Sequence, residues 1–526
     1  MSDLLTIKEA SIWASKLLNK NITPSNISYL IQYGRVPKKG NNGEVFVDKN
    51  DLSEYYKSYT GQKELKWKKK LGEDLNWALS FDYLKEKDTT KHIHRLHPYK
   101  GKFIPQLVEY FLDAHLDDFK KEVYFHPGDI VLDPFSGSGT TLVQANELGM
   151  HAVGVDVSAF NTLITNVKLA KVDFDDLQKE IKRITKELIT FSKKHNNIDF
   201  ERQLLDELAS YNKKFFPSPD YKIKVRQGKI DEKNYTKEKE IQFLQKYRSL
   251  TNQYQIKIKQ DNGSNSFLDK WFNKPVRREI DFVFNELKKV KNPITKKVLT
   301  IVLSRTMRSC RATTHADLAT LKEPVFQPYY CRKHAKICKP LFSILSWWNR
   351  YSKDTYNRLR EFNSLRTNTL QIGLQGDSRK IDIIQALNKK HPALASLVKQ
   401  KKFKGIFSSP PYVGLINYHE QHAYAYDLFG FDRKDELEIG PLYKGQGREA
   451  RQSYVIGVSD VLINSKKYLQ ENYDVFLVAN DKYNLYPDIA SRAGMKIVNT
   501  YKRPVLNRTE KDKSAYAEII FHLKEK

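Results

Sequence analysis

Cysteine is scarce in this sequence, and long apolar runs are missing. Only three cysteines, Cys310, Cys331 and Cys338, occur among 526 residues, which is too few for a disulfide framework. No stretch approaches the roughly 18 continuous apolar residues that span a bilayer, and the N-terminus shows no apolar segment ahead of a cleavage site. We therefore expect a cytoplasmic protein with no membrane role.

Acidic residues are also outnumbered by basic ones. The chain has 62 Asp and Glu against 90 Lys and Arg, which gives a formal net charge of +28. Such an excess favours a polyanionic partner, and nucleic acid is the first candidate. The alternative is that many lysines only keep helix surfaces solvated. Because the chain is too long for one hydrophobic core, we expect two or three domains.

The first 60 residues read as a small helical unit. Thr6 and Glu9 have the spacing of a capping box, and Thr23-Pro24-Ser25 is typical of the start of a second helix. A basic stretch, a Gly40–Gly43 turn and the strand 44–47 follow. The order is similar to the excisionase-like winged helix-turn-helix, including its bend at 34–37. In such domains the second helix enters the major groove, which implies DNA contacts by Ser25, Asn26, Ser28 and Tyr29.

A protein-docking role is the alternative for this N-terminal unit, because helix-turn-helix geometry is also used for packing.

Short apolar strands separated by helical sequence begin near residue 128. This alternation predicts an α/β fold with an open, doubly wound sheet. A helical, Lys-rich and aromatic-rich stretch at about 170–365 is too long for an ordinary connection and reads as an inserted domain. The expected strands are Asp129–Leu132, Ala152–Val155, Leu370–Leu374, Gly405–Phe407, Tyr473–Ala479, Lys496–Thr500 and Tyr516–His522.

A glycine-rich turn follows the first of these strands. In Val131–Thr141, the segment Asp133-Pro134-Phe135-Ser136-Gly137-Ser138-Gly139 leads from strand into helix. Glycines allow a ligand to approach the backbone closely, and the free amides of a helix start meet anionic groups. Asp156 ends the next strand, where α/β nucleotide folds hold ribose hydroxyls. An ordinary tight connection is the alternative.

A second signal is Ser408-Ser409-Pro410-Pro411-Tyr412, directly after an apolar strand. Two prolines fix the backbone at the rim where α/β folds bind substrates. Taken alone, a proline pair after a strand is equally typical of a loop terminator.

Together these motifs resemble the DNA amino-methyltransferases that use S-adenosylmethionine. The cofactor turn matches 133–139, the catalytic (Asp/Asn/Ser)-Pro-Pro-(Tyr/Phe/Trp) matches 409–412, and the family's additional cofactor motif resembles 97–103. The resemblance implies a Rossmann-like seven-stranded methyltransferase fold with a large helical insert. It also implies cofactor contacts by His97, Tyr99, Lys102, Phe103, Asp133, Pro134, Phe135, Gly137, Gly139, Thr140, Asp156 and Asp377.

One departure concerns Asp377, which looks like the family's adenine contact. In the related arrangement that segment usually precedes the insert, whereas Asp377 follows it. We divide the chain into a winged helix-turn-helix at 1–60, a cofactor half at 61–175, an inserted target-recognition domain at 176–367 and a catalytic half at 368–526.

The resemblance also implies a mechanism. An exocyclic amine is a poor nucleophile, so the Ser409 hydroxyl and the Pro410 carbonyl are expected to accept its two hydrogens and orient its lone pair. The base must flip out of the duplex, and Tyr412 is expected to stack on it. Within the family, serine at the first motif position is more typical of cytosine N4 than of adenine N6 methylation. Pro411 completes the predicted catalytic motif.

The expected partner is double-stranded DNA, in a restriction-modification or related defence system with a restriction endonuclease as a further partner. The insert offers donors for phosphates and guanines in one cluster, which consists of Arg305, Arg308, Arg311, Thr313, Thr314 and His315. A charged helix face without DNA contact is the alternative. Further pocket candidates are His419, His422, Tyr424, Tyr426, Lys444–Arg451, Asn507 and Arg508.

Two other functions stay open at this point. One is a DNA-bound regulator with a non-catalytic methyltransferase fold, and the other is methylation of RNA. The cysteines add a question about metal: Cys331, His334 and Cys338, with Cys310 upstream, are residue types that bind zinc, but their spacing is irregular and favours buried thiols. We therefore predict no metal.

Overall fold

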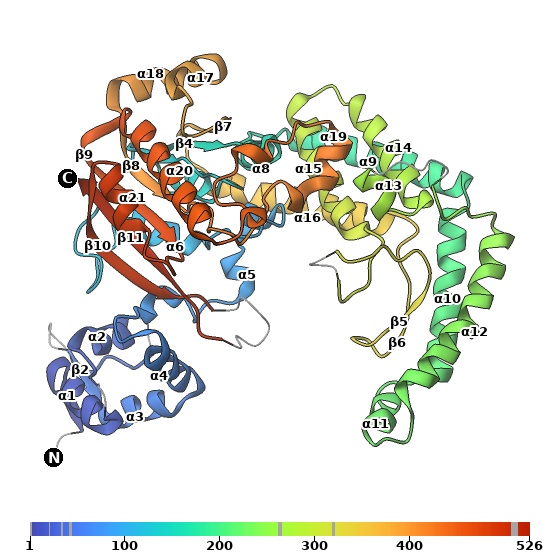
Figure 1. The fold of residues 1–526 in the computed structure, drawn as a ribbon, viewed down its shortest axis with the longest axis horizontal. Coiled ribbons are helices and arrows are strands. Elements are labelled where there is room, and N and C mark those ends of the chain that lie inside the picture. Colours follow the sequence, from blue (N-terminus) through green and yellow to red (C-terminus); the bar gives the residue numbers. More distant parts are fainter. Residues whose placement is uncertain are drawn as a thin grey trace.

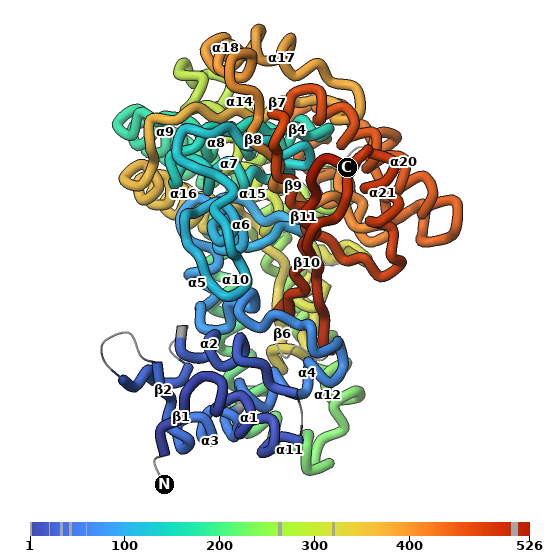
Figure 2. Tube along the Cα trace, turned by 90° about the vertical axis from the view of Figure 1, so that its left-hand side faces the viewer, coloured from blue at the N-terminus to red at the C-terminus, as the bar shows by residue number. Residues whose placement is uncertain are grey.

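The structure is a computed structural model that describes residues 3–19, 21–32, 35–40, 45–260, 266–317, 321–506 and 514–526. Figure 1 shows a sheet domain covered by helices, a helical extension on one side of it and a small helical unit at the N-terminus. In Figures 1 and 2 the N-terminal unit and the far end of the extension both project to the same side of the sheet domain.

The central sheet has seven strands in the order β10-β11-β9-β8-β3-β4-β7. Neighbours from β9 to β7 run parallel, whereas β11 is antiparallel to both β9 and β10. The predicted α/β class and the seven predicted strands are thereby confirmed. The strands are β3 (Ile130–Asp133), β4 (His151–Asp156), β7 (Gln371–Gln375), β8 (Phe403–Ser408), β9 (Leu469–Ala479), β10 (Met495–Pro504) and β11 (Ala517–Glu525).

Both faces of the sheet are apolar, because successive residues of a strand point to opposite sides. On β3, Val131 packs into one core and Ile130 and Leu132 pack into the other. The helices α6 (Pro105–Leu112), α7 (Thr140–Glu147) and α8 (Ala159–Leu169) contribute to the first core. The second core is covered by α17 (Ile383–Lys390), α18 (Pro392–Lys401), α20 (Arg448–Lys466) and α21 (Tyr486–Arg492).

The extension lies between β4 and β7 in sequence and has two parts. Its near part shares the first core with the sheet and consists of α9 (Phe174–Lys194), α13 (Phe267–Trp271), α14 (Lys274–Lys288), α15 (Pro293–Cys310) and α16 (Leu345–Leu365). Its far part, here called the arm, has a separate core. The arm contains α10 (Asn197–Phe215), α11 (Asp220–Arg226), α12 (Glu232–Gln253) and the antiparallel hairpin of β5 (Tyr329–Cys331) and β6 (Lys336–Cys338).

The N-terminal unit has its own core too. The predicted capping box is present: the Thr6 hydroxyl accepts from Glu9 N at 3.3 Å, and the Glu9 carboxylate accepts from Thr6 N at 2.9 Å. The core continues past residue 60 through Trp67 and Trp77. Gly34 and the turn at 41–44 lie outside the described residues. The elements are β1 (Leu4–Thr6), α1 (Ile7–Leu18), α2 (Pro24–Gln32), β2 (Phe46–Asp48), α3 (Lys49–Lys57) and α4 (Tyr59–Leu71).

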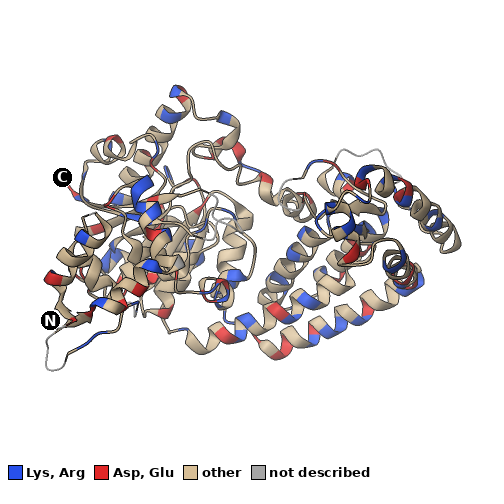
Figure 3. Cartoon of the chain, turned by 90° about the horizontal axis from the view of Figure 1, so that it is seen from below, with Lys and Arg blue, Asp and Glu red and all other residues tan. Residues whose placement is uncertain are grey.

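Two short helices, α5 (Glu86–Thr89) and α19 (Ala423–Phe429), complete the set of α-helices in the described part of the chain. Lys and Arg occur in both the sheet domain and the extension, interspersed with Asp and Glu along the long helices (Figure 3). Among the helices described, none combines the length and the apolar character that crossing a membrane requires.

Candidate active site

The turn after β3 needs its glycines. Gly137 and Gly139 have φ values of +48° and +76°, a region that side chains with a Cβ rarely adopt. A Cβ on Gly139 would lie 2.7 Å from the Thr165 side chain, and one on Gly137 would lie 3.0 Å from the Tyr99 hydroxyl. The turn is therefore packed from both sides and leads directly into the first turn of α7.

Asp156 at the end of β4 is held by this turn. Its carboxylate accepts hydrogen bonds from the backbone N–H of Gly137 at 2.9 Å and of Ser158 at 2.8 Å, and from the Asn161 amide at 3.1 Å. Burial nevertheless outweighs these bonds and raises the pKa of Asp156 to about 6. No described Lys or Arg forms an ion pair with it, so the carboxylate faces the cavity with only dipoles as partners.

Asp133 connects the ends of β3 and β8. It accepts from the Ser408 hydroxyl at 2.5 Å and from Phe135 N at 3.2 Å. Burial raises the pKa of this carboxyl to about 6 as well. Two carboxyl groups without ion-pair partners among the described residues, the buried Asp133 and the partly exposed Asp156, thus lie at the carboxyl ends of adjacent parallel strands. This is where open α/β sheets bind ligands.

A single cavity brings together most of the residues that the sequence singled out. It lies over the carboxyl ends of β3, β4, β7 and β8, and the predicted catalytic loop and the predicted cofactor segments both border it. The predicted residues that line it are Tyr99, Lys102, Phe103, Asp133, Pro134, Phe135, Gly137, Thr140, Asp156, Asp377, Ser409 and Pro411.

Other predicted site residues lie behind the cavity wall. His97 is fully buried, and its Nε2 lies 3.0 Å from the Ser304 hydroxyl of α15. Burial lowers the pKa of His97 well below the ordinary value, so this imidazole is neutral at pH 7. Gly139 packs on Thr165 beneath the turn. We assign both residues a supporting position.

The catalytic loop carries two hydrogen-bond acceptors, but Pro410 is buried and is not part of the cavity lining. Ser409 lines the cavity, and among the described residues none hydrogen-bonds to its hydroxyl or to the Pro410 carbonyl. Tyr412 does not line this cavity. Its hydroxyl donates to Glu518 of β11 at 2.6 Å, and Glu518 accepts from the buried Arg503 of β10 at 3.1 Å. This Tyr412–Glu518–Arg503 connection fixes the loop to the antiparallel edge of the sheet.

Asp377 lines the cavity with its carboxylate already engaged. Arg379 donates to its two oxygens at 2.8 and 2.9 Å, and Arg379 N donates at 3.0 Å. Burial opposes ionisation of Asp377, but these bonds outweigh it and lower the pKa.

Sequence reasoning missed two groups of this site. Glu438 lines the cavity beside the predicted His419, accepts from His419 N at 2.8 Å and also contacts the His419 ring. Lys168 of α8 is fully buried and donates to the Ser138 carbonyl at 2.5 Å beneath the glycine turn. Glu438 lies in an irregular loop and Lys168 lies on a helix. Glutamate and lysine are common in such segments, so the sequence did not indicate that either residue lies at the site.

The three predicted arginines of the insert lie in different surroundings. Arg305 is only 5% exposed and donates to Asp354 at 2.7 Å and Thr355 at 2.9 Å, both on α16. This corrects the expectation that Arg305 contacts DNA, because its guanidinium is buried against α16 and paired with Asp354. Arg308 and Arg311 instead border a hollow formed with Lys100 and His422 and with residues 415–417 after the catalytic loop.

On α2 the structure separates the predicted residues as well. Ser25, Asn26 and Ser28 are partly exposed, whereas Tyr29 is 3% exposed in the core of the unit. Burial corrects the prediction for Tyr29, since a base contact would require this core to open. Asn507 and Arg508 lie outside the described residues.

Comparison with known proteins identifies the family. A family profile described as DNA methylase matches residues 8–167. The chain is 47% identical to the Type II methyltransferase M.MjaII of Methanocaldococcus jannaschii, over 99% of this chain and 97% of that protein. It is 30% identical to the Type II methyltransferase M.MvaI of Kocuria varians over 20% of this chain and 22% of that protein. No solved structure matches. The chain belongs to the N6/N4 family of DNA methyltransferases, which use S-adenosyl-L-methionine as methyl donor.

Proposed function

We propose that this methyltransferase modifies the N4 amine of a cytosine flipped out of duplex DNA. The observation that carries the proposal is the Ser409 hydroxyl, which borders the same cavity as Asp156 and the glycine turn. A methyl donor held against that turn and an amine held by Ser409 would share one enclosed space.

The cavity residues fit S-adenosylmethionine. Asp156 is positioned to accept from ribose hydroxyls, and the turn at Gly137 together with the first N–H groups of α7 suits the carboxylate end. Gly137 lets the turn lie directly against Tyr99, which also lines the cavity. When bound, this cofactor supplies an electrophilic methyl group on a sulfonium sulfur.

The chain's own contribution is to prepare the amine. The lone pair of an exocyclic amine is delocalised into the base, so two acceptors must draw on its hydrogens to localise it. The Ser409 hydroxyl and the Pro410 carbonyl, without partners among the described residues, are suited to that task. Their attachment to β8 and to two prolines keeps their geometry constant during the reaction.

Tyr412 is proposed to stack on the flipped base. Its hydroxyl bond to Glu518 limits rotation of the ring, which supports a role as a fixed platform. Stacking offsets part of the few kcal/mol that unstacking a base costs.

Cytosine is favoured over adenine because the first motif residue is Ser409, as the family resemblance implies. Adenine N6 is the alternative acceptor, and the chemistry of lone-pair localisation would be the same.

For DNA we propose contacts from two places: Ser25, Asn26 and Ser28 on α2 of a winged helix-turn-helix, and Arg308 and Arg311 at the hollow beside the catalytic loop. The N-terminal unit and the arm project to the same side of the sheet domain (Figures 1 and 2), which suits a duplex lying across it. The relatives are named Type II methyltransferases, which supports a restriction-modification role beside a companion nuclease.

The test is to incubate the protein with labelled S-adenosylmethionine and mixed-sequence duplex DNA, digest the product and identify the methylated nucleoside. We expect N4-methylcytosine from the wild type and from Ser364→Ala, a control on the exposed side of α16. Ser409→Ala should lower the yield by about 100-fold or more. N6-methyladenine would overturn the cytosine assignment, and absence of any methylated nucleoside would favour a regulator.

A further inference from the structure

The hairpin of the arm places two cysteines on one face. Tyr329 pairs with Cys338, and Cys331 pairs with Lys336. Because side chains alternate along a strand and directly opposite residues share a face, Cys331 and Cys338 point to the same side. Both thiols are buried, at 4% and 7% exposure, and both are reduced.

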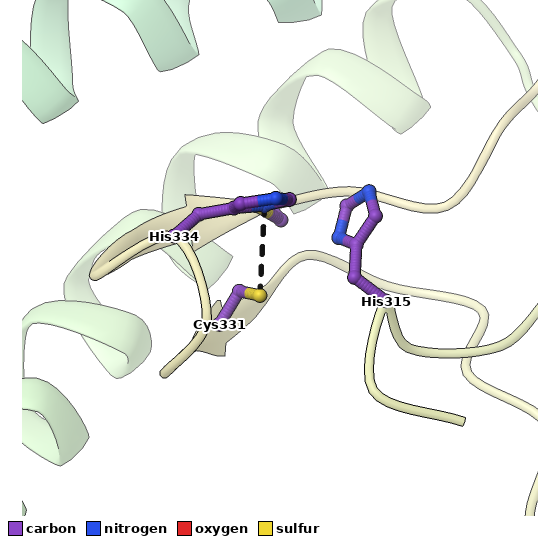
Figure 4. Close-up of side chains that lie close together, drawn as sticks. His315, Cys331 and His334 are labelled. Atoms are coloured by element: carbon purple, nitrogen blue, oxygen red, sulfur yellow. Dashed lines mark hydrogen bonds between the residues drawn. The ribbon is translucent and has the colours of Figure 1, made fainter. Parts of the chain in front are cut away.

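Two histidines complete this cluster. His334 lies in the hairpin turn, where its N–H donates to the Cys331 carbonyl at 3.1 Å. Its Nδ1 lies 3.7 Å from the Cys331 sulfur and 3.4 Å from the Cys338 sulfur. His315 comes from the loop after α15, and its ring centroid lies 4.5 Å from that of His334. Figure 4 shows the His334 and His315 rings gathered around the Cys331 sulfur.

We propose that His315, Cys331, His334 and Cys338 bind a structural zinc ion. One ligand atom of each residue lies within 4.8 Å of the other three. With Zn–S of about 2.3 Å and Zn–N of about 2.0 Å, sulfur and nitrogen atoms of a tetrahedral site are about 3.5 Å apart, close to the two distances that His334 makes.

The chemistry of the donors also selects zinc. Two thiolates and two imidazoles in a tetrahedral arrangement are typical of structural zinc sites. Two thiolates neutralise the charge of the divalent ion, so a partly buried site has no net charge to desolvate. A zinc-bound histidine keeps a hydrogen bond on its other ring nitrogen, and the Tyr329 hydroxyl, 2.9 Å from His315 Nδ1, is within reach.

The position of the cluster explains why a metal is needed there. The described residues between α15 and β5 form no helix or strand, and long irregular loops need other means of support. A hairpin with strands of three residues is marginal by itself. Zinc would join this loop, through His315, to both strands of the hairpin.

Cys310 takes no part, although the sequence suggested it as the upstream ligand. It ends α15 inside the core shared with the sheet, at 1% exposure. The fourth ligand is instead His315, and the earlier prediction of buried thiols without metal is revised accordingly.

The metal site also has a functional consequence, which rests on the proposed DNA contacts. His315 follows Arg311 by four positions, so the zinc would hold the end of the segment that carries Arg308 and Arg311 beside the hollow. Loss of zinc should weaken DNA binding, while binding of S-adenosylmethionine, whose cavity contains none of the four ligands, should be unchanged.

The test begins with elemental analysis of the full-length protein after exhaustive dialysis. We expect about one zinc ion per chain. Protein loaded with cobalt(II) instead should show thiolate-to-cobalt charge-transfer absorption, a signature of sulfur ligation that does not depend on activity. Wild-type protein that stays free of metal after incubation with zinc would overturn the proposal, as would a Cys331–Cys338 disulfide in freshly purified protein.

Variants then identify the ligands. Cys331→Ser and His315→Ala should each lower zinc affinity by more than about tenfold, whereas the control Cys310→Ser should retain the metal, with circular dichroism confirming that each variant is folded. If Cys310→Ser loses zinc and His315→Ala keeps it, this ligand set is wrong. Because metal content is measured without DNA, failure of the zinc site and failure of the proposed methylation remain distinguishable.

Discussion

The carboxylates of the cofactor cavity have no ion-pair partner among the described residues, whereas the buried charge of the insert is paired. In the cavity, neither the buried Asp133 nor the partly exposed Asp156 forms an ion pair among the described residues. Desolvation raises the pKa of each to about 6. In the insert, Arg305 is 5% exposed, forms an ion pair with Asp354 and donates a hydrogen bond to Thr355.

This difference separates residues that await a ligand from residues that hold the fold. Burying a charge is costly unless a partner compensates it. A carboxylate left with only dipoles for partners is available for a ligand with hydroxyl or amino donors. The guanidinium of Arg305 is paired and buried, so a phosphate cannot reach it. Residue type alone does not show whether a charged side chain binds a ligand or holds the fold. Arg305 and Arg308 lie on the same helix, yet only one of these two is buried against α16.

The largest loss of activity is expected when the turn that holds Asp156 is disturbed. Gly139→Ala should reduce methyl transfer about 100-fold, because the new Cβ would meet Thr165 at 2.7 Å and shift the turn against the cofactor. Gly128→Ala is the matched control: φ is +86° there too, but nothing lies within 4 Å, so it should cost roughly 1 kcal/mol of stability without loss of activity. Equal losses of activity in the two variants would mean that backbone strain at the positive φ, and not the contact with Thr165, lowers the activity.

A second test asks whether Arg305 is purely structural. Arg305→Ala should lower the free energy of unfolding by about 2 to 3 kcal/mol, somewhat less than for a fully buried pair, because Asp354 is 32% exposed and keeps its bond to Arg358. Arg308→Ala, one turn away, should change it by less than about 0.5 kcal/mol. Chemical denaturation of both variants measures this, and a stable Arg305→Ala that binds DNA poorly would reverse the assignment.

A third test concerns the carboxyl group of Asp133. Its folded-state pKa of about 6 lies above the ordinary 3.8, so the unfolded chain loses this proton first and ionisation costs stability as the pH rises from about 4 to 6. Asp133→Asn removes that cost and should be more stable than wild type at pH 8 by on the order of 2 kcal/mol, with no gain at pH 4, while losing activity.

Denaturation curves of wild type and Asp133→Asn at the two pH values measure this difference. Asp206→Asn, on an exposed face of α10, is the control and should change stability equally little at both pH values. If Asp133→Asn raises the free energy of unfolding more at pH 4 than at pH 8, ionisation of Asp133 does not destabilise the folded state.

The weakest effect is expected for the two arginines that border the hollow beside the catalytic loop. Arg308→Ala or Arg311→Ala should weaken DNA binding about tenfold and reduce the slope of log affinity against log salt by about one if each contacts one phosphate. Titration of duplex DNA at several salt concentrations measures both quantities. An unchanged salt slope would show that the hollow beside the catalytic loop does not bind the DNA backbone.

The sheet and its glycine turn could be predicted from sequence because their signals are local. A buried parallel strand requires a short apolar run, and Gly137 and Gly139 are required by the backbone itself. The partners of the site could not be predicted in this way. Glu438 contacts His419 across a loop, and Glu518 reaches Tyr412 from the last strand. Neither pair of residues has a fixed spacing along the sequence that would reveal the contact.

Residues that are neighbours along the chain were enough to predict the α/β class, the seven strands, the order of the motifs and the family. The folded chain was needed to show which charged residue is paired and which faces the cavity. It also showed that Tyr29 and Arg305 are buried and that His315, rather than Cys310, lies beside Cys331 and Cys338. Burial and pairing depend on which distant element packs opposite a side chain. The same helix position can carry an arginine that faces solvent or one that faces Asp354.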